Sequence, residues 1–478
     1  MGVNMKRKIL VVFLIGCFLL MSSITTGIQL KENNSEKNID ATSKYKDFKE
    51  CPVMEVSTEL AERMQEEYNN AEFAYIDPNL AEEIQGTETY SILDLLEYDP
   101  ETRSQGGCGN CWAWPSTAVL AMALNVQEGI KDRLSVQFIN TCGQRYTYGN
   151  NLIECCGGGT IGMLANFYSN TNFAIPWSNT MAHWHDGGLL NCRTDCKEIG
   201  KTPNYKIYDI DDVTIRTRNV PEEEAIENIK NVLHQQKGVY FSVFYPDLID
   251  LDNFRNMWRN DGETDSYDLD YYCGNEWTED AVGHAMLIVG YHDVEGTEDD
   301  YWIVLNSWGT TANRPNGLLA WDMHIDYNCK YSNYYAFAAK TLDVDFTPDP
   351  NAPEAPIING PTNIEPNKEY TYEFSAVDPQ GDDVYIYIKW TKDNYGSGWL
   401  GPYASGEVIE VSHTWTEEEN FVLRARARDE NKNTSIYTSF FVSMPRNRAN
   451  NMPFYNFLAE YLHLFPILQR IMQRFIQY

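Results

Sequence analysis

The sequence predicts an α+β protein in which a helical half and a strand-rich half are followed by a separate all-β sandwich. A helix is expected over residues 111–128, because a continuous apolar stretch occupies positions 113–126. Short runs of β-branched and aromatic residues, bounded by turn residues, predict strands at 238–244, 285–291 and 301–306. The length of 478 residues leaves room for two or three domains.

A proline-rich segment at 347–356 predicts a stiff linker between two folded parts. Beyond it, alternating apolar and polar runs are separated by turns, which is typical of a β-sandwich over 357–446. The expected strands lie at 369–377, 383–390, 407–415, 420–429 and 435–443.

The N-terminus has the order of an export signal over residues 1–27. The basic group Lys6–Lys8 precedes an apolar run, Ile9–Met21, and a small, polar stretch, Ser22–Gly27. The apolar run is short beside the ~20 residues of a spanning helix, so an uncleaved anchor is the weaker alternative. Lipid attachment at Cys17 is discounted, because the apolar run continues past it.

Two further segments have open roles. Residues 28–85 are charged, with one helical pattern at 60–68, and form either a propeptide or a linker ahead of a domain at 86–346. In the tail, 447–478, apolar residues recur at helical spacing around Pro466. Such a tail lies on a membrane surface, docks on a partner or packs on its own sandwich.

The formal net charge of −32 excludes an obvious nucleic-acid surface, since phosphates are bound by stripes of Lys and Arg. Solubility is the simpler explanation of this acidity, and attraction of basic substrates is the other.

The chain has 11 cysteines, of which Cys17 and Cys51 precede the expected domain. In an exported protein, the default expectation for most of the others is a set of disulfides. These residues are Cys108, Cys142, Cys155, Cys156, Cys192, Cys196, Cys273 and Cys329. A zinc site at Cys192 and Cys196 is the alternative, but no second pair with zinc-finger spacing follows.

Cys111 has a different context from the other cysteines. It follows a glycine-rich turn and stands at the start of the expected helix, where the helix dipole favours a thiolate. His284 and Asn306 follow far downstream, in the order of a thiol protease. A structural cysteine is the competing interpretation.

Four local motifs in this order resemble the papain family of cysteine peptidases, over about residues 90–345. They are 105–112, Cys156-Gly-Gly-Gly159, Gly283-His284-Ala285 and Asn306-Ser-Trp-Gly309. The resemblance implies a two-lobed catalytic domain with the cleft between a helical lobe and a β-barrel-like lobe. It also implies protein or peptide substrates and no required cofactor or metal.

The resemblance assigns roles to single residues. Cys111 is the expected nucleophile, and His284, as base and acid, would form an ion pair with it and lower the pKa of the thiol. Asn306 would orient the imidazole and Trp308 would shield that hydrogen bond. Gln105 and the backbone N–H of Cys111 would stabilise the oxyanion. The remaining expectation is that Gly157, Gly158 and Gly159 line the substrate cleft, a plain turn being the alternative.

The resemblance also implies disulfide pairs: Cys108–Cys156, Cys142–Cys192 and Cys273–Cys329. Cys155 and Cys196 are left over and are expected to pair with each other.

The chain departs from the family pattern in several places. Asn110, Trp114 and Pro115 replace the usual residues, and the interval from Cys111 to His284 is long, with extra length expected at 176–201 and 245–272. Subsite preference, and the choice between endopeptidase and exopeptidase, therefore do not transfer.

The C-terminal part resembles the immunoglobulin-like and PKD-like modules of secreted microbial enzymes. Its acidic turn with Asp378, Asp382 and Asp383 is either a Ca²⁺ loop or a solvated turn. His183 and His185 could be mistaken for metal ligands, but their context does not support a metal site.

These observations together predict a secreted or cell-surface cysteine peptidase that works as a monomer, with its C-terminal tail as a means of surface attachment. The competing hypothesis is a catalytically silent, peptidase-like protein that serves in binding or surface adhesion.

Overall fold

The computed structural model describes the part of the chain that carries the two predicted domains. The described ranges are 51–70, 72–146, 153–188, 192–268, 273–294, 300–348, 350–390, 396–416, 421–431 and 433–444. The predicted export signal and the amphipathic tail lie outside these ranges. Within them, no helix combines the length and the apolar character that crossing a membrane requires.

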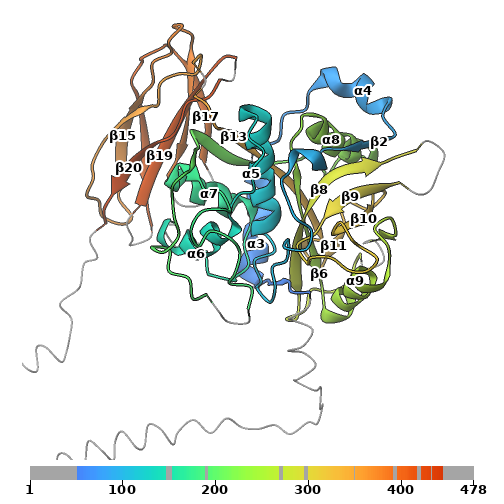
Figure 1. Ribbon diagram of the computed structural model, residues 1–478. Coiled ribbons are helices and arrows are strands. Elements are labelled where there is room, and N and C mark those ends of the chain that lie inside the picture. Colours follow the sequence, from blue (N-terminus) through green and yellow to red (C-terminus); the bar gives the residue numbers. More distant parts are fainter. Residues whose placement is uncertain are drawn as a thin grey trace, which may run out of the picture. The chain divides into compact units, whose positions relative to one another are not determined.

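Helices occupy mainly the first half of the peptidase-like part (Figure 1). The α-helices are α3 (Thr58–Asn70), α4 (Ala81–Gln85), α5 (Ala113–Glu128), α6 (Val136–Tyr146), α7 (Ile161–Thr171), α8 (Glu222–His234) and α9 (Leu248–Asn260). Two 3₁₀ turns are η1 (Pro78–Leu80) and η2 (Leu93–Leu95).

Helix α5 is the expected central helix, and it is buried on nearly all sides because its residues are apolar all round. Pro115 falls in its first turn, where a missing N–H is tolerated. Gly129 ends it with a left-handed φ of 66°. Near that end the Gln127 side chain donates to the Val344 carbonyl and accepts from the Phe346 N–H, which ties α5 to the strand leaving the domain.

The strands of this part form one large sheet with the order β5-β13-β6-β8-β9-β10-β7, and β1 and β2 both pair with β8. Their bounds are β1 (Met54–Glu55), β2 (Thr89–Ser91), β5 (Asp209–Thr214), β6 (Val239–Tyr245), β7 (Ser266–Tyr267), β8 (Val282–His292), β9 (Tyr301–Leu305), β10 (Leu318–Asp322) and β13 (Phe337–Asp345). Two small pairs add β3 (Phe173–Ala174) with β4 (Tyr205–Lys206), and β11 (Lys330–Tyr331) with β12 (Tyr334–Tyr335).

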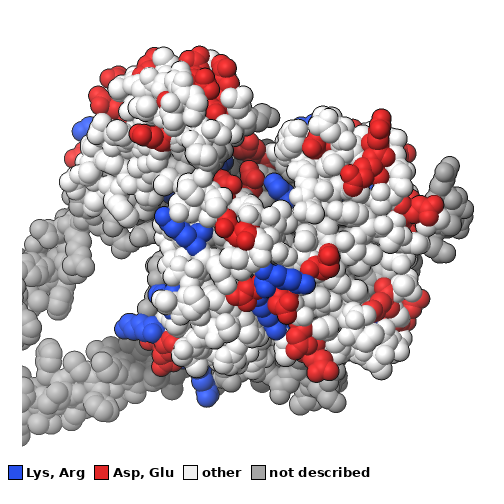
Figure 2. Space-filling view, turned by 45° about the horizontal axis from the view of Figure 1, so that its top comes forward, with Lys and Arg blue, Asp and Glu red and all other residues white. Residues whose placement is uncertain are grey.

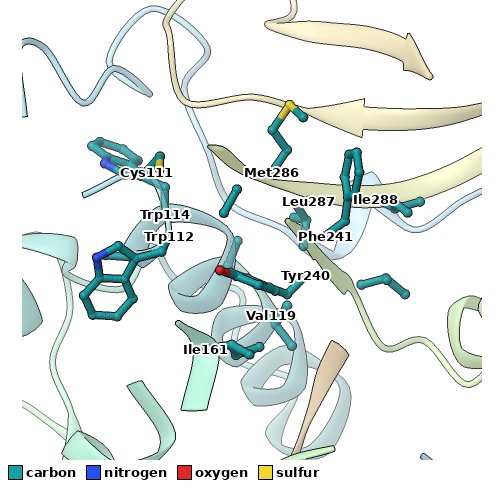
Figure 3. Packing of buried hydrophobic residues seen from close by; sticks show 14 of the residues in the cluster. Cys111, Trp112, Trp114, Val119, Ile161, Tyr240, Phe241, Met286, Leu287 and Ile288 are labelled. Atoms are coloured by element: carbon teal, nitrogen blue, oxygen red, sulfur yellow. The ribbon is translucent and has the colours of Figure 1, made fainter. Parts of the chain in front are cut away.

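The core of the peptidase-like part lies between α5 and the sheet. Strand β6 is buried along its whole length, as is β8 except for its last residue. Figure 3 shows Val119 of α5 close to Tyr240 and Phe241 of β6, with Met286 and Leu287 of β8 beyond them. This packing holds the start of α5 against the middle of the sheet, where the candidate site forms.

The C-terminal part is a sandwich of two antiparallel sheets with its own core, which confirms the predicted α+β class with an all-β appendage. One sheet has the order β14-β15-β18 and the other β17-β16-β19-β20. The strands are β14 (Ile357–Asn359), β15 (Glu369–Ser375), β16 (Val384–Lys389), β17 (Gly396–Tyr403), β18 (Ile409–Thr414), β19 (Phe421–Asp429) and β20 (Thr438–Val442). Strands β14 and β17 have no counterpart among the strands expected from the sequence.

The surface carries the acidity that the composition implies. Figure 2 shows Asp and Glu side chains distributed over the visible face, with Lys and Arg in separate smaller groups between them and along the left and lower edges. This distribution agrees with the formal net charge of −32.

Candidate active site

Cys111 lies one residue before Trp112, the N-cap of α5, and is fully buried. The turn before it needs Gly109, because a Cβ there would lie 2.8 Å from the Cys156 carbonyl oxygen. Figure 3 shows Cys111 at this end of α5, on the side that faces Met286 of β8. The helix therefore presents the thiol to the strand that carries the candidate base.

His284 comes from the buried strand β8, and the turn after β9 brings Asn306 to it. The imidazole Nε2 lies 2.8 Å from Asn306 Oδ1, and its Nδ1 is buried without a hydrogen-bond partner among the described residues. Trp308 stacks on the imidazole, with ring centroids 4.5 Å apart. An Nε2–H bonded to the amide oxygen would leave Nδ1 as the basic nitrogen.

Gln105 is held by two hydrogen bonds at the turn before Cys111. Its Oε1 accepts from Ser307 Oγ at 2.7 Å, and its Nε2 donates to the Cys108 carbonyl at 2.7 Å. These contacts fix the amide orientation and leave one N–H of the side chain for another acceptor. Ser307 is not among the site residues expected from the sequence, although its place directly after Asn306 could have drawn attention to it.

A segment ahead of the domain, Cys51–Val56, covers this group of residues. Strand β1 within it pairs with β8, Met54 opposite Gly283, and Met54 is fully buried. Trp308 Nε1 donates to the Pro52 carbonyl at 2.9 Å, and Arg255 donates twice to the Cys51 carbonyl, at 3.0 and 3.1 Å. We call Cys51–Val56 the covering segment.

The covering segment changes the protonation expected for the site. Burial raises the pKa of Cys111 to about 11, with hydrogen bonds from backbone groups of Ala285 and Met54 opposing it only in part. Burial lowers the pKa of His284 to about 3, although the Asn306 hydrogen bond acts in the opposite direction. The predicted ion pair and lowered thiol pKa are therefore wrong for this covered state, in which both groups are neutral.

The three glycines after Cys156 have different surroundings. A Cβ on Gly158 would meet the Glu55 carbonyl oxygen of the covering segment at 3.1 Å. Gly159 instead lies under the Trp112 ring, which a Cβ at that position would approach to 2.5 Å, and the Gly157 carbonyl accepts from Trp112 Nε1 at 3.0 Å. Gly158 thus borders the cleft, whereas the other two support Trp112.

Four disulfides form in the described part of the chain. Cys108–Cys156 and Cys273–Cys329 pair as the resemblance implies. The expected Cys142–Cys192 and Cys155–Cys196 pairs are wrong, since Cys142 bonds to Cys196 and Cys155 to Cys192. Both arrangements join the same segments of chain, so spacing alone does not distinguish them. Cys51 and Cys111 are buried and take no part in these disulfides.

The other candidate sites receive little support from the geometry. Among the described residues, the one group of His, Cys, Asp and Glu ligand atoms close enough to hold a metal is Cys155, Cys156 and Cys192, all bonded in disulfides. His185 instead bonds to Thr194 Oγ1 and the His183 carbonyl.

The acidic turn of the sandwich is organised by its own backbone. Asp378 Oδ1 accepts from the N–H groups of Gln380 and Asp382, at 2.8 and 3.0 Å. The described carboxylates of Asp378, Asp382 and Asp383 do not converge into a cluster of metal-ligand spacing. The geometry is that of a hydrogen-bonded turn.

The family comparison agrees with the geometry of the site. Residues 97–246 and 256–339 match the family described as "Papain family cysteine protease". This match includes Gln105, Cys111, His284, Asn306 and Trp308, and leaves out Arg255 and the covering segment.

Curated proteins with similar sequences include peptidases from animals and plants. Pro-cathepsin H of Bos taurus is 30% identical over 207 residues, covering 43% of this chain and 51% of that protein. Zingipain-2 of Zingiber officinale is 26% identical over 243 residues, covering 50% and 90% respectively. The chain thus spans about half the length of the first of these relatives.

Among solved structures, the chain is similar to the PKD domain of an M14-like peptidase from a Thermoplasmatales archaeon. The sequence identity is 39% over 21% of this chain and all of that domain, with a TM-score of 0.20.

Proposed function

Because the chain carries a papain-family cysteine peptidase domain, we propose that it is a secreted enzyme that hydrolyses peptide bonds by a Cys-His-Asn mechanism. The observation that carries this proposal is the arrangement of Cys111 at the start of α5 opposite His284, whose Nε2 lies 2.8 Å from Asn306 Oδ1. The disulfides support an exported protein, since such bonds persist in oxidising compartments.

In the proposed reaction, the Cys111 sulfur attacks the carbonyl carbon of the scissile peptide bond as its proton passes to His284. The imidazolium then gives this proton to the leaving amine, and the acyl group remains as a thioester on Cys111. A water molecule attacks the thioester while His284 takes its proton. The carboxylic acid leaves and the proton returns to the thiolate, which restores the starting state.

Gln105 is the proposed oxyanion donor together with the backbone N–H of Cys111. Its hydrogen bonds to Ser307 and Cys108 support this role, since they hold one amide N–H in a fixed direction. Donors that need no reorganisation during the reaction stabilise the tetrahedral intermediate most strongly. Trp308 would keep water away from the His284–Asn306 pair.

We also propose that the covering segment is part of a propeptide that keeps the enzyme latent. It occupies the substrate side of Gly158 and buries both Cys111 and His284. A substrate carbonyl therefore has no access to the thiol until the segment has left. The helix α3 that follows the segment belongs to the same N-terminal region, and cleavage after it would free the cleft.

The test is active-site labelling with an epoxysuccinyl inhibitor, followed by mass mapping, on the protein before and after removal of its N-terminal segment. One adduct on Cys111 is expected, only after removal and not in His284→Ala. Peptide hydrolysis should fall on the order of 10⁴-fold or more in Cys111→Ala.

Cys51 offers a matched control, because it is the other buried cysteine that takes no part in the four disulfides. Cys51 leaves with the covering segment, so it serves as a control for the intact protein: any adduct that the intact protein forms and the Cys51→Ser variant does not is assigned to Cys51 and not to Cys111. If the opened and folded protein takes up no inhibitor, the silent binding or adhesion hypothesis replaces the enzymatic one.

A further inference from the structure

A small cavity lies between the first turns of α5 and the loops before α5 and α6. Its volume is about 20 Å³, and its lining includes Arg103, Trp114, Thr117, Arg133 and Trp177. A space of this size is sufficient for one particle as large as a water molecule.

Three buried donors in this lining have no hydrogen-bond partner among the described residues. They are Arg103 Nη2, Trp114 Nε1 and Thr117 Oγ1. Their residues are exposed by only 6%, 1% and 3%. A buried donor without an acceptor costs about 1–3 kcal/mol, and native structures rarely leave several in one place.

The positive charge of Arg103 increases the need for an acceptor in this cavity. Burial, together with the neighbouring Arg133, lowers the pKa of Arg103 to about 9, so the guanidinium still carries its charge at neutral pH. No ion pair joins Arg103 to a carboxylate within the described ranges. Burying a cation is strongly unfavourable unless a counter-charge is buried with it.

The other charged groups near the cavity do not supply that counter-charge. Glu97 is an exposed residue of the lining, and with Asp99 it acts on Arg133, partly opposing the effect of burial on the pKa of that residue. Arg133 also donates to the Thr102 hydroxyl and carbonyl, and stacks on Trp177 at 3.5 Å. Tyr98, the remaining titratable neighbour, is neutral at physiological pH because burial raises its pKa.

We propose that this cavity binds a small monovalent anion, of the chloride class, between the side chains of Arg103, Trp114 and Thr117. A halide accepts from several donors at once and neutralises the guanidinium, which a water molecule would not do. A monatomic anion fits a cavity of this size.

The anion site is joined to the candidate active site through Arg103. Arg103 Nε donates to the Asn306 carbonyl at 3.0 Å, and the Arg103 carbonyl accepts from the Gly309 N–H at 2.9 Å. Gln105 is two residues further along the chain. Arg103 is thus a positioning residue for the Asn306 turn, and a bound anion would hold its side chain in place. This functional link rests on the proposed peptidase activity, whereas anion binding does not.

The experiment uses the full chain, purified into sodium gluconate so that no halide is present at the start. Crystals soaked in sodium bromide should show an anomalous peak between Arg103 Nη2, Trp114 Nε1 and Thr117 Oγ1. In solution, the unfolding temperature should rise with chloride at constant ionic strength and reach a plateau. A cavity that holds only water in bromide, with no saturable chloride effect, would overturn the proposal.

Two matched valine substitutions separate this site from general salt effects. Thr117→Val keeps the side-chain shape and removes one donor, and should weaken the chloride response about tenfold. Thr217→Val removes another buried hydroxyl that lacks a partner among the described residues but does not line the cavity, and should leave the response unchanged. An equal response in both variants would contradict the proposed site. Because neither measurement needs peptidase activity, failure of the anion site and failure of the proposed function can be told apart.

Discussion

At the scale of single residues, the main finding is that the candidate nucleophile and base are both neutral while the covering segment is in place. Cys111 and His284 are fully buried, and burial is the largest cause of both pKa shifts. The sequence identified both residues but not their protonation, because the covering segment has no pattern that predicts where it binds.

We expect acid to favour opening of the site. The lowered pKa of His284 means that the closed form favours neutral imidazole. This preference stabilises the closed form above pH 6.5, the ordinary pKa of histidine. The stabilisation is lost as the pH falls from 6.5 towards about 3, the pKa of His284 in the closed form. The raised pKa of Cys111 has its effect in a more alkaline pH range. Because the closed form favours the neutral thiol, it is weakened only above pH 9, where an exposed thiol ionises. The rate at which a small thiol reagent labels Cys111, divided by its rate with an unprotected thiol at the same pH, should therefore increase from pH 7 to pH 4, because the division removes the pH dependence of the thiolate itself.

The control for this prediction is His284→Gln, which removes the titrating group and keeps a polar side chain. Its opening should lose the acid dependence between pH 6.5 and pH 4. An unchanged acid dependence in this variant would assign the effect to carboxylates elsewhere.

A second residue-scale prediction concerns Gly159. An added Cβ would lie 2.5 Å from the Trp112 ring, so Gly159→Ala should destabilise the fold by about 1–3 kcal/mol. Chemical denaturation measures this change. Gly86→Ala is the control, because its Cβ would have its nearest neighbour at 3.4 Å and should cost little. Equal stability of the two variants would show that the ring moves aside.

How well the candidate site could be predicted depends on what each residue contacts. Gln105, His284 and Asn306 stand in local motifs, and local motifs can be recognised in a sequence. Ser307 and Arg103 act through contacts with distant segments, which no single stretch of sequence contains. The exchanged disulfides have the same cause, since two cysteines four residues apart compete for partners on one other segment.

At the scale of elements, the covering segment is an added strand on the central strand β8. It is held at three places: β1 pairs with β8, Arg255 donates to the Cys51 carbonyl, and Trp308 donates to the Pro52 carbonyl. Further along, Glu72 and Ala74 exchange backbone hydrogen bonds with Thr214 of β5. The segment is therefore bound by backbone contacts as well as by apolar burial.

We expect Met54→Ala to open the site selectively. Met54 is fully buried where the covering segment meets Gly158 and Gly283, so its truncation should weaken the closed form by about 2–5 kcal/mol. At neutral pH the thiol reagent should then reach Cys111 faster, by an order of magnitude or more. Met323→Ala is the control, since Met323 is equally buried in the domain core. If both variants react at the same rate, opening requires unfolding of the whole domain.

Sequence patterns predict the elements unevenly. Strands β6, β8 and β9 consist largely of β-branched and aromatic residues, and their observed ends lie close to the expected ones. Strand β17 escapes prediction because its sequence, Gly-Ser-Gly-Trp-Leu-Gly-Pro-Tyr, has the composition of a turn. Its register along β16 shifts twice, which fits a strand rich in glycine.

At the scale of the whole molecule, the sandwich contacts the peptidase domain through buried charges. Asp211 of β5 accepts from Lys389 Nζ at 2.6 Å, Arg426 Nη2 at 2.9 Å and the Tyr437 hydroxyl at 2.9 Å. Asp209 accepts from Arg426 Nη1 at 2.7 Å. Burial opposes ionisation of Asp211, but Arg426 and Lys389 outweigh it and lower its pKa to about 2.

We expect Asp211→Asn to release the sandwich without unfolding it. The substitution leaves Lys389 and Arg426 buried with too little negative charge, a cost of about 3–5 kcal/mol. The sandwich keeps its own core and should stay folded. Faster proteolysis within 347–356, and a larger radius of gyration in solution scattering, would report the release.

Asp212→Asn is the neighbouring control, because Asp212 pairs with Lys340 inside the peptidase domain. It should lower the stability of that domain and leave the linker protected. A protected linker in Asp211→Asn as well would mean that apolar contacts alone hold the two parts together.

Helix α5 has a practical consequence for the design of fusion proteins. Its 16 residues make a rod about 24 Å long, with Cys111 just before one end and Gln127 near the other. Gln127 forms hydrogen bonds to Val344 and Phe346, where the chain leaves the domain. The position of this exit point is therefore fixed relative to Cys111 by helix α5. A cargo domain joined directly after Phe346 would therefore have a defined orientation relative to the peptidase domain. A junction upstream of Val344 would remove the two Gln127 hydrogen bonds and leave the orientation of the cargo undefined.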